Sequence, residues 1–173
     1  MLSNCIITTT LLSLSAVASA TEIALYWGQS TAKQDSLATY CSKGDADIFI
    51  LSFMNNFSSA SNDPPFEINF SDACGIKGAN GILKCDTIAT DINTCQKLGK
   101  KVFLSLGGGT GSYGFKSKED GEAFADTLWN YFGAGKGVST EDRPFGDSIV
   151  DGFDFDIEMG DILYLCCSSM SIP

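Results

Sequence analysis

Residues Asp151–Glu158 read DGFDFDIE and alternate acidic with apolar side chains. Alternate side chains of an extended strand point to the same face, so Asp154, Asp156 and Glu158 would share one face. Their Cα atoms would be spaced by about 6.5 Å, because a strand rises about 3.3 Å per residue. Like-charge repulsion and desolvation favour the protonated form of a carboxyl group. We therefore expect one of the three to hold a proton.

Alternation alone leaves three interpretations of this acidic face open. A protonated carboxyl group could protonate a leaving oxygen, as glycoside cleavage requires. Carboxylate oxygens are also the ligands that Ca²⁺ and Mg²⁺ prefer, so a cation site is a second interpretation. The simplest alternative is a solvated acidic edge strand without a chemical role.

Four short stretches rich in β-forming residues predict the strands of one sheet. They are Glu22–Trp27, Asp47–Met54, Lys101–Leu106 and Ser148–Glu158. The second and third are apolar nearly throughout, which is typical of parallel strands covered on both faces. The segment Asn55–Cys85 contains Gly, Asn and Pro and two cysteines, and we expect a stapled loop at one end of the sheet.

Helical patterns separate the predicted strands. Apolar residues recur at helical spacing in two sets, Ile88, Ile92, Cys95 and Leu98, and Phe124, Leu128 and Phe132. Ser117 followed three residues later by Asp120 resembles a capping box in front of the second set. Strands that alternate with helices predict an α/β fold with a parallel sheet in one domain.

Composition excludes several classes of function. The 173 residues carry 11 Lys and Arg against 21 Asp and Glu, a net charge of −10, and contain no histidine. Nucleic acids and anionic membrane surfaces are poor partners for such a chain, because they select positive charge. Ser-His-Asp and Cys-His nucleophiles and His-ligated metals are absent, so carboxylates are the expected acid and base groups.

Gly107–Gly114 reads GGGTGSYG and contains a G-x-G-x-x-G match directly after a predicted strand. A dinucleotide site is nevertheless a poor interpretation, because the match lies outside the first strand-helix unit of the chain. Glycines here can equally let a loop pass close to a ligand or to neighbouring strands.

The N-terminal residues Met1–Ala20 contain no charged side chain and end in the small residues ASA. We interpret them as a secretory signal peptide, with an uncleaved anchor helix as the alternative. Secretion would let the remaining six of seven cysteines form disulfides, for which 15 pairings exist. Their spacing does not fit a zinc site. Asn56 and Asn69 begin the glycosylation pattern N-x-S.

Three motifs carry a family resemblance. The acidic positions of Asp151–Glu158 match the D-x-x-D-x-D-x-E signature of glycoside hydrolase family 18. SLGG at Ser105–Gly108 resembles the second hallmark of that family, and ALYWGQ at Ala24–Gln29 resembles the first barrel strand of class III chitinases, the secreted fungal and plant type. The motifs occur in the right order, and the resemblance covers Glu22–Glu158.

The resemblance implies a (β/α)₈ TIM barrel with its active site at the C-terminal ends of the strands. It implies that Glu158 is the general acid and base. Asp156 would turn toward Glu158 or the substrate's acetamido group, and Asp154 would help to set the charge on Asp156. Such enzymes cleave β-1,4-linked N-acetylglucosamine polymers with retention, and the nucleophile is the substrate's own N-acetyl oxygen.

Further residues receive roles from the same resemblance. Asp151, Ser105, Gly107 and Gly108 would be structural members of the two hallmarks. The residues expected to contact sugar are Tyr26, Gln29 and Asn55. The implied disulfides are Cys41–Cys95 and Cys74–Cys85. Chitin or N-acetylchitooligosaccharides are the expected partners, no metal or other cofactor is expected, and the location would be extracellular or in the cell wall.

The resemblance ends at Glu158. We therefore predict a signal peptide over 1–20, the N-terminal half of a family 18 barrel over 21–158, and an unrelated apolar tail over 159–173. Four of eight strands would not close a barrel, and their free edges would favour self-association. We interpret the sequence as a truncated chitinase whose activity stays open. A carbohydrate-binding relative without turnover and an inactive fragment are the alternatives.

Overall fold

A computed structural model describes residues 21–30, 33–58 and 62–159 of the chain. The predicted signal peptide at 1–20 and the tail beyond Met159 lie outside the described residues, as do Cys5, Cys166 and Cys167.

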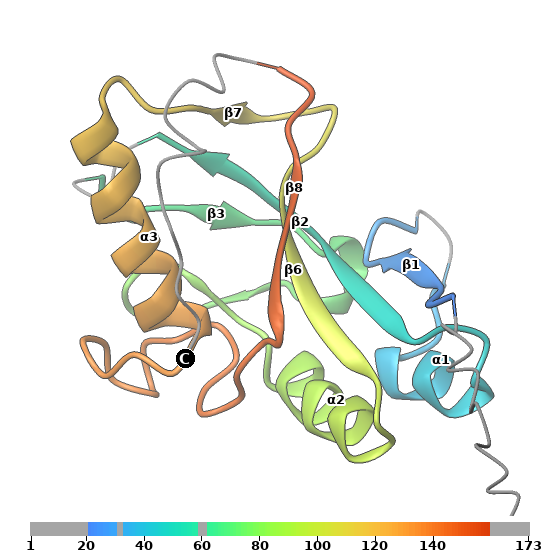
Figure 1. The fold of residues 1–173 in the computed structure, drawn as a ribbon. Helices are drawn as coiled ribbons and strands as arrows, with labels where there is room; N and C mark the ends of the chain where they lie inside the picture. The colour runs from blue at the N-terminus through green and yellow to red at the C-terminus, as the bar shows by residue number, and fades with distance from the viewer. Residues whose placement is uncertain (1–20, 31–32, 59–61, 160–173) are drawn as a thin grey trace, which may run out of the picture.

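The centre of the fold is a parallel sheet whose strands follow one another in chain order (Figure 1). Its main strands are β1 (Ala24–Trp27), β2 (Ile48–Phe57), β6 (Lys101–Gly107) and β8 (Gly152–Asp156). These are the four strands predicted from the sequence. β2 extends beyond Met54 to Phe57, and the last strand is shorter than the predicted Ser148–Glu158.

The helices α1 (Leu37–Lys43), α2 (Asp86–Lys97) and α3 (Lys118–Phe132) lie in the connections between successive main strands. The sequence patterns predicted α2 and α3. The Ser117 side chain accepts a hydrogen bond from the backbone N–H of Asp120, which supplies the N-cap of α3. α1 is capped in the same way by Ser36, which accepts from the backbone N–H of Thr39.

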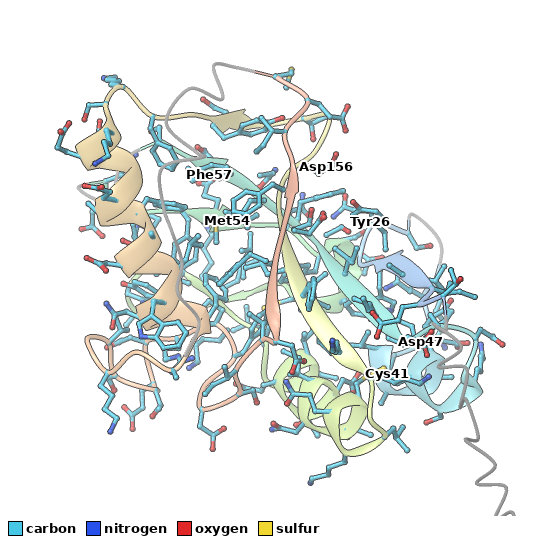
Figure 2. All side chains as sticks on the ribbon, viewed as in Figure 1. Tyr26, Cys41, Asp47, Met54, Phe57 and Asp156 are labelled. Carbon is cyan, nitrogen blue, oxygen red and sulfur yellow. A yellow bond between two sulfur atoms is a disulfide. The ribbon has the colours of Figure 1, made fainter. Side chains whose placement is uncertain are left out.

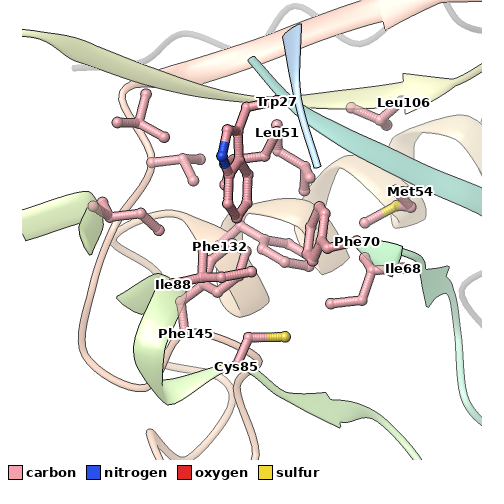
Figure 3. Packing of buried hydrophobic residues seen from close by; sticks show 14 of the residues in the cluster. Trp27, Leu51, Met54, Ile68, Phe70, Cys85, Ile88, Leu106, Phe132 and Phe145 are labelled. Carbon is pink, nitrogen blue, oxygen red and sulfur yellow. The ribbon is translucent and has the colours of Figure 1, made fainter. Parts of the chain in front are cut away.

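One face of the sheet packs against the helices and forms the core. Trp27, Leu51 and Leu104 share one register row and are buried there. They belong to one cluster with residues from all three helices and from the connecting loops (Figure 3), among them Cys41, Ile88, Ile92, Phe124, Leu128, Phe132 and Phe145. The opposite face carries Tyr26, Ser105 and Asp154, because adjacent residues of a strand point to opposite sides.

Two disulfides fasten this arrangement within the described ranges. Cys41 of α1 is bonded to Cys95 of α2, and Cys74 is bonded to Cys85 just before α2. These are the two pairs that the family resemblance implies. The first joins the helices of two successive connections behind the sheet, and the second closes a short loop.

The segment predicted as a stapled loop contains more regular structure than expected. It includes the short strands β3 (Glu67–Ile68), β4 (Ile76–Lys77) and β5 (Leu83–Lys84) and the 3₁₀ turn η1 (Ser71–Ala73). β3 pairs with β2 in antiparallel orientation, and β4 pairs with β5. A further short strand, β7 (Ser112–Tyr113), follows β6 and pairs with the end of β2. Strands of two residues carry too little periodic pattern to be read from sequence.

Candidate active site

The carboxyl ends of the parallel strands gather the acidic residues of the last strand and the glycines that follow β6. Figure 2 shows Asp156 at the end of β8, while Asp47, just before β2 begins, lies at the opposite end of the sheet. This is the end at which barrel enzymes of the α/β class place their chemistry.

Asp154 accepts two side-chain hydrogen bonds from neighbouring strands. Its Oδ2 atom accepts a hydrogen bond from the Ser105 hydroxyl at 2.7 Å and another from the Tyr26 hydroxyl at 2.9 Å. Ser105 is fully buried on β6 and pairs with Asp154 in the sheet register. Asp154 is therefore tied to the first and third main strands, which fixes its position.

The environment of Tyr26 raises the pKa of its hydroxyl group. Desolvation raises the pKa of its hydroxyl to about 12, and the hydrogen bond to Asp154 and the charges of Asp154 and Asp156 act in the same direction. Its ring lies 6.0 Å from that of Phe53, and much of the side chain is exposed. The Tyr26 hydroxyl is therefore a neutral donor at ordinary pH.

The SLGG motif brings the end of β6 against the end of β8. The backbone N–H of Gly108 donates a 2.7 Å hydrogen bond to the carbonyl oxygen of Asp156. Gly107 has a φ of +115°, and a Cβ there would collide with the same carbonyl. Glycine alone tolerates both the positive φ and this close approach at Gly107, because it has no Cβ.

β8 ends at Asp156, so Glu158 lies two residues beyond the strand. The Glu158 side chain is exposed, and its carboxylate lies against the glycine loop: a Cβ built at Gly109 would be 3.3 Å from Oε2 of Glu158. A loop position allows the carboxyl group to face solvent and an incoming ligand.

Asp151 lies at the other end of the acidic stretch and has structural contacts. Its Oδ2 atom accepts hydrogen bonds from the backbone N–H of Val102 at 2.8 Å and from the Gln96 side chain at 3.0 Å. The N–H of Asp151 also donates to the carbonyl oxygen of Val102. Asp151 therefore joins the start of β8 to β6 and α2, far from the carboxyl end of the sheet.

The three predicted sugar-contacting residues are divided between two hollows. Tyr26 and Gln29 line a cavity of about 360 Å³ beside β1, and Glu158 is not among its lining residues. Asn55 lines a separate cavity of about 230 Å³ with Glu67, Asn69 and Lys77. The Gln29 side-chain nitrogen donates to the carbonyl oxygens of Ser52 and Asn69 at 2.8 and 2.7 Å, so this amide also braces the wall between the two hollows.

Sequence reasoning missed two residues near the acid. Gly109 was considered only within a dinucleotide motif, yet it adjoins the Glu158 carboxylate. Tyr113 received no role, although its hydroxyl accepts hydrogen bonds from the backbone N–H groups of Glu158 and Met159. Their position in the same Gly-rich stretch was the only available signal. An acidic side chain against this loop would also repel a dinucleotide pyrophosphate.

Two further properties concern the described residues alone. Within the described ranges, no group of three or more Cys, Asp or Glu side chains is placed to hold a metal ion. In the same part of the chain, no helix has the length and apolar character needed to cross a membrane.

The chain is similar to known proteins over part of the length of those proteins. No model of a known protein family matches the sequence. The chain is 55% identical over 139 residues to the endochitinase of Saccharomyces cerevisiae, which covers 80% of this chain and 23% of the yeast protein. The chain thus spans about a quarter of the length of that relative.

Solved structures agree in fold. The ICChI chitinase of Ipomoea carnea superposes with a TM-score of 0.71 and 38% identity, covering 83% of this chain and 49% of that one. The xylanase and alpha-amylase inhibitor XAIP-II of Scadoxus multiflorus superposes with a TM-score of 0.67 and 31% identity, covering 82% of this chain and 47% of that one.

Proposed function

Because the chain is homologous to part of the glycoside hydrolase family 18 chitinases of the fungal and plant class III type, we propose that it hydrolyses β-1,4 bonds between N-acetylglucosamine units. Its sheet β1-β2-β6-β8, alternating with helices, matches part of the family's (β/α)₈ barrel. The observation that carries the proposal is the position of Glu158, exposed at the carboxyl end of the sheet and adjacent to Gly109.

In this proposal, Glu158 protonates the glycosidic oxygen as the bond to the anomeric carbon breaks. The N-acetyl carbonyl oxygen of the same sugar attacks that carbon and forms a cyclic oxazolinium ion. Glu158, now ionised, takes a proton from the water that opens the ring. Two displacements at one carbon give net retention of configuration.

The neighbouring carboxylates would support these steps electrostatically. Asp156 would hold the acetamido group so that its oxygen faces the anomeric carbon. Asp154 would act on Asp156, and its two hydrogen bonds from Ser105 and Tyr26 fix where its negative charge lies. Fixed charges that meet a developing positive charge lower the barrier without reorganising during the reaction.

We extend the proposal to the partner and the location. Chitin and N-acetylchitooligosaccharides would bind across the carboxyl end of the sheet, with Tyr26, Gln29 and Asn55 lining the flanking hollows. The two disulfides and the chitinase homologues suggest a secreted protein. We propose an extracellular or cell-wall location after removal of residues 1–20, with residues 21–158 as the barrel segment.

Sugar binding without turnover is the second candidate. It is favoured by the similarity to the xylanase-alpha-amylase inhibitor protein XAIP-I, which was solved in complex with trehalose and superposes with a TM-score of 0.66 and 33% identity. An intact Glu158 favours the hydrolase over this alternative, because a binding protein has no need of an exposed acid above the glycine loop.

The test is hydrolysis of a fluorogenic N-acetylchitooligosaccharide by the secreted, folded chain, alongside chitin pull-down. Turnover that Glu158→Gln lowers by at least 10³-fold, with chitin binding retained, supports the hydrolase. Glu141→Gln is the matched control, because Glu141 is an exposed acid in the loop after α3. Binding without turnover supports the second candidate, and the absence of both from folded protein rejects the two together.

A further inference from the structure

The Tyr113 hydroxyl connects the glycine loop to the backbone of the proposed acid. It accepts hydrogen bonds from the N–H groups of Glu158 and Met159, each at 3.1 Å, and donates to the carbonyl oxygen of Gly108 at 2.8 Å. A hydroxyl group has one donor and two acceptor positions, so all of its hydrogen-bonding capacity is used. This full set of partners fixes the orientation of the O–H bond.

The Tyr113 ring is itself held by the core. It stacks on Phe57 with ring centroids 5.3 Å apart and an interplanar angle of 14°. Phe57 is buried and contacts Phe115 and Phe124 in turn. The backbone of Tyr113 pairs with that of Phe57 in the sheet, so ring and backbone are both anchored to β2.

Glu158 and Met159, whose N–H groups donate to this hydroxyl, lie beyond the end of β8. β8 ends at Asp156, whose carbonyl oxygen accepts from the N–H of Gly108. Glu158 follows two residues later with an exposed side chain. The N–H of Gly108 thus bonds directly to the end of β8. Its carbonyl oxygen is linked through the Tyr113 hydroxyl to the backbone of the residues that follow the strand.

We propose that Tyr113 is a positioning residue for the Glu158 carboxyl group, an inference that rests on the proposed role of Glu158 as the acid. Its hydroxyl fixes the peptide planes on both sides of the Glu158 Cα and thereby the direction in which the side chain leaves the backbone. Proton transfer depends steeply on such geometry: a displacement of about 1 Å can cost on the order of 10²-fold in rate. Tyr113 has no contact with the reacting atoms in this scheme.

Tyr113→Phe is the direct test, because it removes the hydroxyl and keeps the ring that stacks on Phe57. Tyr131→Phe is the matched control: Tyr131 is a half-buried tyrosine of α3 whose ring packs edge-on against Phe66. Two measurements are compared between the variants and the parent chain. They are the NMR solvent-exchange rates of the Glu158 and Met159 amides, and kcat and KM on the fluorogenic oligosaccharide.

In Tyr113→Phe, we expect exchange at both amides to rise at least tenfold and kcat to fall 10- to 100-fold, with KM changed less than twofold. Tyr131→Phe should change none of these values. Unaltered exchange, or a loss confined to KM, would overturn the positioning role. A parent chain without turnover would overturn the proposed function instead, and the exchange ratio alone would then decide whether Tyr113 places Glu158.

Discussion

Tyr26 and Asp154 lie on the first and fourth main strands of the sheet, yet the Tyr26 hydroxyl donates a 2.9 Å hydrogen bond to Oδ2 of Asp154. Two strands, β2 and β6, lie between them in the sheet order. On the face opposite the helices, the side chains of the two outer main strands therefore reach each other across the strands between them. A hydrogen bond across that face ties the first family motif to the last one.

The first prediction concerns the titration of Tyr26. Its pKa is raised to about 12, against about 10 for an unfolded tyrosine, so the folded state disfavours the phenolate. The resulting stabilisation is complete below pH 10 and is lost as pH rises through about 12. An ultraviolet difference titration of the parent chain against Tyr26→Phe should show one tyrosine ionising near pH 12.

Asp154→Ala is the control for this measurement. Without the carboxylate, Tyr26 loses a hydrogen bond and an adjacent negative charge, so its ionisation should move to lower pH. A difference curve centred near the ordinary tyrosine value of about 10 in the parent chain would contradict the contact.

A second prediction concerns the bond between Ser105 and Asp154. A double-mutant cycle of Ser105→Ala and Asp154→Ala, measured by urea unfolding, should give a coupling energy of about 1.5 kcal/mol. This is the lower end for hydrogen bonds to charged groups, because Asp154 is only half-buried. Additive effects of the two substitutions would show that the 2.7 Å contact contributes nothing to stability.

The glycine loop offers a third prediction with an internal control. Gly107→Ala places a Cβ into the carbonyl of Asp156 at a φ of +115°, so it should lower the free energy of unfolding by more than about 2 kcal/mol. Gly109→Ala meets only the flexible end of Glu158 and should change it by less than about 0.5 kcal/mol.

Gly109→Ala should affect turnover although it leaves stability nearly unchanged. Gly109→Ala displaces the Glu158 carboxylate by a few tenths of an ångström and should lower kcat about tenfold in a fully folded protein. Equal kcat values for Gly109→Ala and the parent chain would argue against contact between this loop and the acid.

The disulfides give a fourth prediction. Cys41–Cys95 closes a loop with a sequence separation of 54, and Cys74–Cys85 one of 11. Loop entropy in the unfolded chain gives about 4 kcal/mol for the first and about 3 kcal/mol for the second. Urea unfolding should therefore rank the paired Cys→Ala variants in that order. The reverse order would mean that native contacts around Cys74, and not chain entropy, dominate.

The sequence predicted the strands and the two longer helices because each repeats a strong pattern. DIFILSFM and KVFLSL are apolar enough to specify buried parallel strands, and Ser117 marks the start of α3 with its own side chain. The structure of Asn55–Cys85 could not be read in this way, because its strands are two residues long and depend on pairing partners distant in the chain.

The acidic residues of the candidate site stand out in the sequence as a period-2 pattern, whereas the residues that contact them do not. Period-2 alternation predicts that Asp154 and Asp156 share a face, but it cannot detect that β8 ends at Asp156, two residues before Glu158. The end of β8 depends on its pairing with β6, which is distant in the sequence. The hydroxyl of Tyr113 is 45 residues away from Glu158 in sequence, and local pattern contains no signal for such a contact.

The chain-order arrangement of the main strands has a consequence for how the protein forms on the ribosome. Along the path β1-β2-β6-β8, each main strand pairs with the one synthesised just before it. A newly emerged strand and its helix can therefore dock onto an existing sheet edge, without waiting for a distant partner. The order of strand pairing thus follows the order of synthesis, and the Cys41–Cys95 bond can close once α2 has entered an oxidising compartment.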